Sequence, residues 1–255
     1  MTQRNHMAEA QAQFFDADEV EIVPATSKPQ KVPSYLRDHR ARLRERFMVG
    51  GSDAMPDYEI LELVLFRAIP RQDVKPLARS LIETFGSFGA AIGATPKQLG
   101  KVKGVGDSVI AELKIIEAAA QRLAKSKVMQ QHVVASWNAL IDYCHTVMDH
   151  REVEQFRILF LDRKNRLIAD EEQARGTVDH VPVYPREVVK RALELNASAL
   201  ILVHNHPSGD PTPSESDISV TRQIQYACDV MGLSVHDHII VGKSKEVSFR
   251  AKGLL

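Results

Sequence analysis

The residues best suited to chemistry lie in one stretch, HNHPSGDPTPSESD, at residues 204–217. The apolar run ALILV that precedes it is short and rich in branched side chains, as expected of a buried central strand. Because alternate residues of a strand point to the same face, His204 and His206 can reach one ion. Three prolines and a glycine follow, so the strand must give way to a loop.

Ser214, after this loop, suits the N-cap of a helix, and Asp217 lies three residues later, in the first helical turn. The chain turns back at this helix, so Asp217 can face the two histidines. Two imidazoles and one carboxylate suit Zn²⁺, and three protein ligands leave the fourth tetrahedral position to water. Because zinc lets such a water ionise near neutral pH, the stretch predicts hydrolysis or a deamination-like attack by water. The Ser-x-x-Asp cap alone needs no metal; the complete spacing favours one.

That spacing, His-x-His, seven residues, Ser, two residues, Asp, resembles the JAMM motif of MPN-type metalloproteases. The surrounding sequence, including FLDRKNRLIADEEQARG and PREVVKRALELNASALILVHNHPSGD, resembles the bacterial RadC family over about residues 34–255. The resemblance implies that His204, His206 and Asp217 bind zinc, and that Ser214 helps to hold the oxyanion of the attacked carbonyl. It also implies a JAMM/MPN-like fold with a cytidine-deaminase-like architecture.

A JAMM enzyme also needs a general base that accepts a proton from the attacking water. Glu171 and Glu172, in IADEEQARG, are the candidates, and the RadC-like pattern favours Glu171. Neighbouring residues of a strand face opposite ways, so at most one of the two can serve. The alternative is that both are solvent-facing charges.

A second His-x-His pair, His236 and His238 in VHDHII, could also chelate an ion. No third ligand follows it at a turn-like spacing. We therefore expect His238 to lie in the core or beside a metal ligand, with Asp237 or that ligand as its partner. His180, in TVDHVP, has no assigned role.

Strands and helices alternate in residues 133–255, which predicts an α/β domain with a mixed sheet flanked by helices. A hairpin is expected around Arg163-Lys164-Asn165. Strands are expected near 174–181, 198–206 and 235–242, and helices over about 136–147, 185–197 and 214–233.

Residues 33–127 have a helical pattern throughout, which predicts an α-helical domain. Its expected helices fall within 34–47, 55–69, 74–86 and 95–125, the last range holding two helices around a Gly-Val-Gly turn. Residues 1–32 show no sustained period and are expected to be a disordered tail, with a docking segment around Phe14 and Phe15 as the alternative.

The stretch LGKVKGVGDSVIAELK resembles a helix-hairpin-helix motif. Gly104 and Gly106 permit a tight turn whose N–H groups face an anion, and the helix starting near Asp107 directs its positive end there. With Lys103 beside it, the turn predicts DNA-phosphate contact that reads no bases. The alternative is a turn that only packs two helices, with the basic residues forming a solvated face.

The composition is that of a globular protein, with 44% hydrophobic residues, and Lys plus Arg and Asp plus Glu balance at 33 each. The whole-chain charge therefore predicts no acidic partner. Cys144 and Cys228 are too few for a disulfide scaffold, and they fit packing roles in a reducing cytoplasm. No apolar run approaches the roughly 18 residues of a membrane span. We expect a cytoplasmic protein without a membrane partner.

Two functions from different classes follow. The first is a zinc-dependent hydrolase, a metallopeptidase that cleaves an amide or isopeptide bond in an unknown protein or peptide substrate. The second is a DNA-associated repair or recombination accessory protein, in keeping with the RadC name, whose zinc site is structural or vestigial. A nuclease is disfavoured, because phosphodiester cleavage usually recruits more carboxylates around two metals.

Overall fold

The computed structural model describes residues 34–133, 135–175 and 183–255. The tail expected at residues 1–32, with Phe14 and Phe15, lies outside the described residues, as does His180. Most of the strand expected near 174–181 also lies outside them.

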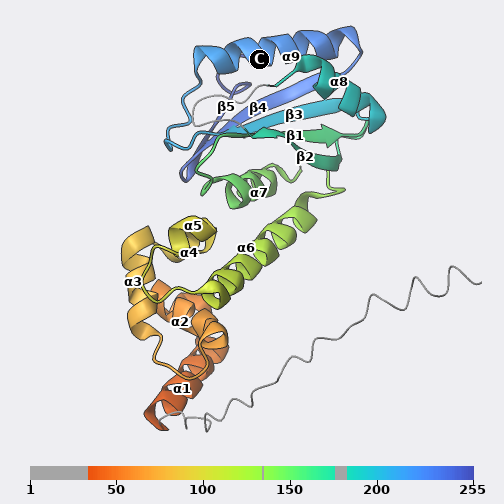
Figure 1. The fold of residues 1–255 in the computed structure, drawn as a ribbon. Helices are drawn as coiled ribbons and strands as arrows, with labels where there is room; N and C mark the ends of the chain where they lie inside the picture. The colour runs from red at the N-terminus through yellow and green to blue at the C-terminus, as the bar shows by residue number, and fades with distance from the viewer. Residues whose placement is uncertain (1–33, 134, 176–182) are drawn as a thin grey trace, which may run out of the picture.

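A five-stranded mixed sheet forms the centre of the carboxyl-terminal part, with strand order β2-β1-β3-β4-β5 (Figure 1). Strands β3 and β4 pair in parallel, and the other neighbours pair antiparallel. The predicted mixed sheet flanked by helices is confirmed. The strands are β1 (Gln155–Leu161), β2 (Leu167–Arg175), β3 (Ala199–Asn205), β4 (Ser234–Gly242) and β5 (Lys245–Ser248).

Helices cover both faces of this sheet, with α7 (Trp137–Met148) on one face and α8 (Pro185–Glu194) and α9 (Glu215–Val230) on the other (Figure 1). Every residue of β3 is therefore buried, which explains its nearly continuous apolar sequence. The two cysteines are free and pack in these cores, as expected, and burial raises the pKa of both thiols.

Helix α9 is the crossover between the parallel strands β3 and β4, a connection that parallel pairing requires. Strand β3 ends at Asn205 and α9 begins at Glu215, so the carboxyl end of the strand lies close to the amino end of the helix. This arrangement brings the ends of the HNHPSGDPTPSESD stretch together.

The amino-terminal part is helical, as predicted, and no strand lies within its described residues up to α6. Its core contains fully buried leucines from several helices, among them Leu61, Leu81 and Leu113. The elements are α1 (Ser34–Gly50), the 3₁₀ helix η1 (Ser52–Ala54), α2 (Asp57–Ala68), α3 (Lys75–Phe85), α4 (Phe88–Gly93), α5 (Pro96–Leu99) and α6 (Asp107–Val128).

Helix α6 takes part in two cores. Val109 and Leu113, near its start, pack among the amino-terminal helices, whereas Val128 at its end packs beneath the sheet. The polar segment that follows is tied down as well. The N–H of Gln130 donates to the carbonyl of Leu167, and the N–H of Val133 donates to that of Asn165, both at 2.9 Å. The segment between the two parts is therefore anchored to the β1–β2 hairpin.

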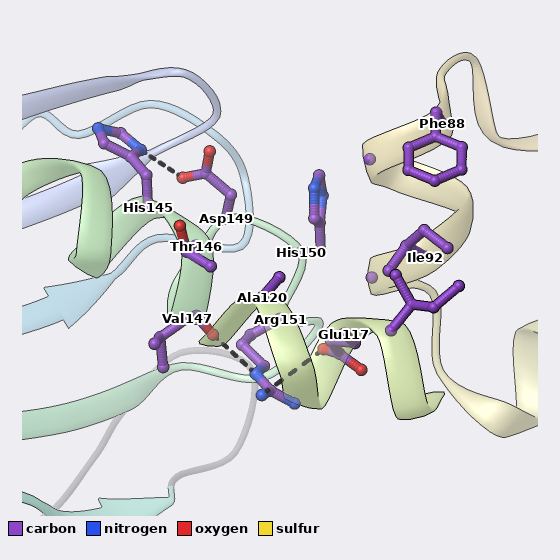
Figure 2. A pocket seen from close by; sticks show the side chains of 13 residues that line it. Phe88, Ile92, Glu117, Ala120, His145, Thr146, Val147, Asp149, His150 and Arg151 are labelled. Carbon is purple, nitrogen blue, oxygen red and sulfur yellow. Dashed lines mark hydrogen bonds and ion pairs between the residues drawn. The ribbon is translucent and has the colours of Figure 1, made fainter. Parts of the chain in front are cut away.

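A pocket of about 350 Å³ lies where α4 and α6 approach α7 (Figure 2). Phe88 and Ile92 of α4 line one side, and His150, just after α7, faces them. Arg151 of the same segment pairs with Glu117 of α6 at 3.8 Å. The two parts of the chain thus meet through a hollowed contact of mixed polarity.

None of the helices in the described ranges combines the length and the apolar character that a membrane span requires.

Candidate metal centre

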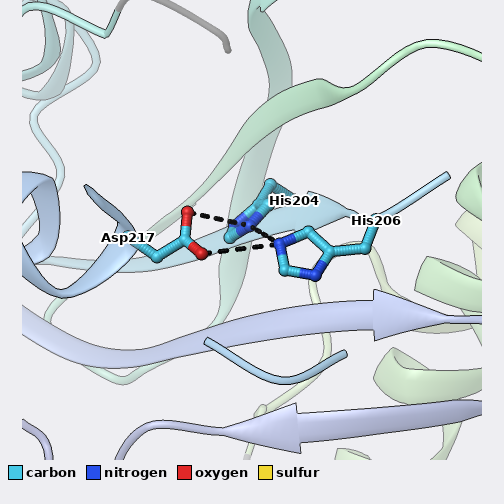
Figure 3. Close-up of side chains that lie close together, drawn as sticks. All are labelled: His204, His206 and Asp217. Carbon is cyan, nitrogen blue, oxygen red and sulfur yellow. Dashed lines mark hydrogen bonds and ion pairs between the residues drawn. The ribbon is translucent and has the colours of Figure 1, made fainter. Parts of the chain in front are cut away.

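Three side chains converge between the end of β3 and the start of α9 (Figure 3). The Nε2 atoms of His204 and His206 lie 3.0 Å apart. The Asp217 carboxylate faces both: Oδ1 is 3.3 Å from Nε2 of His204, and Oδ2 is 3.4 Å from Nε2 of His206. Among the described residues, these three form the one group of His, Cys, Asp or Glu side chains close enough to share an ion. The expected convergence is therefore observed.

Asp217 is held in place by the helix start. Its Oδ2 accepts hydrogen bonds from the N–H of Ser214 at 2.8 Å and from the Ser214 hydroxyl at 2.7 Å. The Ser214 oxygen in turn accepts from the N–H of Asp217 at 3.2 Å, which completes a capping box. The N-cap role of Ser214 is confirmed, and the cap fixes the direction in which the carboxylate points.

His206 is oriented by its own loop. Its Nδ1 lies 2.7 Å from the carbonyl oxygen of Asp210, which can only accept a hydrogen bond. In the neutral ring the proton therefore sits on Nδ1, and Nε2 presents its lone pair to Asp217 and His204. His206 is partly exposed, whereas His204 is fully buried, so the centre opens to solvent on the His206 side.

The loop after β3 is seated on Gly242, which ends β4. A Cβ atom at this position would come within 2.4 Å of the carbonyl oxygen of Gly209 and 2.8 Å of Pro211. The N–H of His206 also donates to the carbonyl of Val241 at 2.9 Å. Sequence reasoning did not identify Gly242 as part of the site. A glycine at the end of a strand is the available signal, because it often marks close backbone approach.

The carboxylate and the histidines shift each other's protonation. Burial favours a higher pKa for Asp217, but hydrogen bonds with His204 and His206 outweigh burial and hold the pKa well below its usual range. The hydrogen bond with Asp217 raises the pKa of His206. The centre thus contains a firmly ionised carboxylate beside two imidazoles, which is an attractive environment for a cation.

Behind the centre lies His238, which β4 presents on the same face as His204. Its Nε2 is 2.8 Å from Nδ1 of His204, and its Nδ1 is 2.6 Å from the Thr221 hydroxyl. Burial lowers the pKa of His238. His238 therefore lies in the core and beside His204, as expected. His236 does not join it, because the pairing of β3 with β4 shifts at this point, and its ring bonds Asn165 at 2.8 Å instead.

Glu171 and Glu172 point to opposite faces of β2, as expected. Glu171 accepts two hydrogen bonds from Arg191 of α8, at 2.6 and 2.7 Å, and these lower its pKa. Glu172 faces Arg157, with 3.9 Å between the charged groups. Glu171 is level with Ile158 and His204 is level with Phe156, two strands apart in the sheet. Strand spacings place their Cα atoms roughly 12 Å apart.

The turn between α5 and α6 is exposed at Lys103, Gly104 and Gly106. Gly104 has a φ of 92°, which favours glycine, and Gly106 is the extended N-cap residue of α6. Val102 is buried and Val105 packs against the helical core. The turn is therefore tight, as predicted, while Lys103, Gly104 and Gly106 remain exposed. Helix α5 has only four residues, so the helix before the Gly-Val-Gly turn is a single helical turn long.

The mixed sheet, with its His-x-His at a strand end and its aspartate at the next helix start, is consistent with a JAB/MPN-like fold. In agreement, residues 134–254 match the model of the RadC-like JAB domain. The chain is 70% identical over 224 residues to a UPF0758 protein of Ruegeria pomeroyi, covering 88% of this chain and all of the relative. It is 71% identical over 213 residues to a UPF0758 protein of Rhodobacter capsulatus, covering 84% of this chain and all of that relative. The chain belongs to the RadC family.

Proposed function

We propose that this RadC-family protein is a zinc-dependent hydrolase, a JAMM-type metallopeptidase that cleaves an amide or isopeptide bond. The observation that carries the proposal is the convergence of His204, His206 and Asp217 on one point. In the neutral His206 ring, Nδ1 donates its proton to the Asp210 carbonyl, and the unprotonated Nε2 faces the Asp217 carboxylate and the His204 ring. A divalent cation satisfies these three acceptors together.

The donor set fits zinc. Two imidazole nitrogens and one carboxylate oxygen are ligands that zinc accepts, and three protein ligands are typical of its catalytic sites. When bound, zinc would polarise a carbonyl group and lower the pKa of a water at the fourth position. The exposed side of His206 supplies the approach for that water and for a substrate.

Ser214, at the start of α9, contacts Asp217 through both its backbone N–H and its hydroxyl. The Ser214 hydroxyl has one proton, which it donates to Asp217. To support an oxyanion, the hydroxyl must turn that proton toward the substrate. The N–H of Ser214 continues to hold Asp217 at 2.8 Å, so the ligand keeps its direction during that turn.

Glu171 is the proton acceptor in this proposal. It lies on the sheet face that carries His204, since its strand neighbour Ile158 packs in the same core as Phe156, which stacks on His204. Acting as a base requires Glu171 to leave Arg191 and to extend along β2 toward the centre. We further propose that the substrate is a protein or peptide, that the protein works in the cytoplasm, and that the architecture is cytidine-deaminase-like.

Metal-dependent cleavage of a mixed peptide pool tests the proposal. Protein loaded with zinc should produce new peptide termini, detected by mass spectrometry. Removal of the metal by a chelator should abolish them, and added zinc should restore them. Cleavage that survives complete removal of zinc would contradict the proposal, as would inactivity of the loaded protein towards amide and isopeptide bonds alike.

We also propose that the α5–α6 turn contacts DNA phosphates without reading sequence. The support is that Lys103, Gly104 and Gly106 are exposed and directly precede the first residue of the 22-residue helix α6. This contact would bring the hydrolase to DNA-bound substrates. If the zinc centre proves inactive, the same turn supports the accessory function in repair or recombination.

A further inference from the structure

A line of buried hydrogen bonds runs behind His204 and ends at a backbone carbonyl. His204 Nδ1 and His238 Nε2 are 2.8 Å apart, and His238 Nδ1 and the Thr221 hydroxyl are 2.6 Å apart. The hydroxyl lies 2.5 Å from the carbonyl oxygen of Asp217. His204 and His238 have no exposed surface and Thr221 has 1%. Water therefore cannot substitute for any member of the line.

The direction of every bond follows from its last member. A carbonyl oxygen can only accept, so the Thr221 hydroxyl donates its single proton to the backbone carbonyl of Asp217. Thr221 can then only accept from the His238 ring, which places that ring's proton on Nδ1. Neutral His238 consequently accepts at Nε2, and His204 must donate from Nδ1. The remaining nitrogen of His204, Nε2, is left with a lone pair facing Asp217 and His206.

The neutral state of His238 is set by its surroundings. The ring lies between Phe156 and Phe249, with centroids at 5.5 and 4.6 Å. The adjacent Asp237 does not bond the ring, because it accepts from backbone N–H groups and from Ser248. A charged imidazolium would be buried in this apolar pocket with no carboxylate bonded to it, and burial disfavours the charged form. If it did form, it would donate to His204 and move the His204 proton onto the ligand nitrogen.

We propose that Thr221 and His238 are positioning residues of the metal centre. They hold His204 as the Nδ1-protonated tautomer and aim its Nε2 lone pair at the ion. The inference rests on the proposed zinc centre and extends it to residues outside the motif. Asp217 takes part at both ends of this line, because its backbone carbonyl accepts from Thr221 and its carboxylate faces His204 as a proposed ligand. The helix and the strand are thereby locked in the relative position that the centre needs.

Substitution at Thr221 tests the proposal, because Thr221→Val removes the hydroxyl and keeps the shape. Zinc affinity, measured by competition with a chromophoric chelator, should fall by about 10- to 100-fold. Thr221→Ser should restore it. Thr146→Val is the matched control: its hydroxyl also donates to a carbonyl four residues back, at 2.7 Å, but on the opposite side of the sheet. That variant should bind zinc like the wild type.

Ring-nitrogen NMR of the metal-free protein separates this inference from the proposed function. The His204 signals, assigned with His204→Gln, should show the proton on Nδ1 in the wild type and a tautomer mixture in Thr221→Val. Protonation at Nε2 in the wild type would overturn the inference without any variant. So would a folded Thr221→Val protein with wild-type tautomer and affinity. A wild-type protein with the expected tautomer that binds no zinc would instead refute the proposed hydrolase.

Discussion

The pairing of Glu171 with Arg191 bears directly on the role proposed for Glu171. Its carboxylate accepts two hydrogen bonds from Arg191, and these hold its pKa low. A carboxylate with a depressed pKa is ionised at neutral pH but is a weak proton acceptor. The proposed catalytic role therefore requires the pair with Arg191 to open when substrate binds.

The change Glu171→Gln tests this role directly. Because Glu171 is proposed as a base and not as a ligand, the variant should keep its zinc and lose turnover by about 10²- to 10⁴-fold. Glu172→Gln is the matched control, since Glu172 faces the other side of the sheet. Zinc content and cleavage rate are measured together. Loss of zinc in Glu171→Gln would make Glu171 a ligand, and full activity would remove it from the mechanism.

The convergence of His204, His206 and Asp217 could be predicted from sequence because the three lie within 14 residues of one another, along a strand end, a loop and a helix start. Thr221, His238 and Gly242 act on this stretch from outside it. Their roles depend on how β4 pairs with β3 and on how the loop rests on Gly242. His-x-His spacing cannot reveal such contacts. For His238, sequence reasoning identified the neighbourhood but could not choose the partner.

Among the elements, the α5–α6 turn combines a structural and a proposed binding role. Val102 and Val105 hold the turn against the helical core, so the turn forms whether or not DNA binds. Gly106 is different, because its backbone is extended and a Cβ there would meet no atom within 4 Å. A side chain at Gly106 is therefore tolerated by the fold but would stand between the helix end and a phosphate.

Gly106→Asp should weaken DNA binding while preserving the fold, since aspartate is a favourable N-cap residue. Gly106→Ala, which adds volume without charge, should weaken binding less. In the wild type, binding should not depend on sequence, and for about two phosphate contacts it should weaken roughly tenfold between 50 and 200 mM salt. Fluorescence anisotropy with unrelated duplexes measures both effects. Equal affinity of the wild type and Gly106→Asp at low salt would leave the turn with a packing role alone.

Most elements could be predicted from periodicity, whereas three short ones, η1, α4 and β5, could not. Helix α4 has six residues, two of them glycine, and the Ser87 side chain caps it by accepting from the N–H of Ala90. Strand β5 has four residues and forms only by pairing with β4. Segments this short have too few residues to show a period. Tertiary contacts decide whether they form.

At the scale of the whole molecule, α6 and the segment after it join the two parts. Residues 126–133 are largely polar in sequence, but buried Val128 and Val133 and the hydrogen bonds to the hairpin attach this segment to the sheet. The proposed DNA contact and the metal centre thus lie on parts connected by one continuous helix and an anchored segment. That geometry suits a hydrolase brought to its substrates by its amino-terminal part.

The zinc content of purified protein tests the central claim most directly. Elemental analysis should find about one zinc per wild-type chain, and His206→Ala should lose most of it. His236→Ala provides the control, because His236 belongs to the second His-x-His pair and bonds Asn165 away from the centre. It should retain the wild-type amount. Equal loss of zinc from both variants, or a folded wild-type chain that takes up none, would contradict the account.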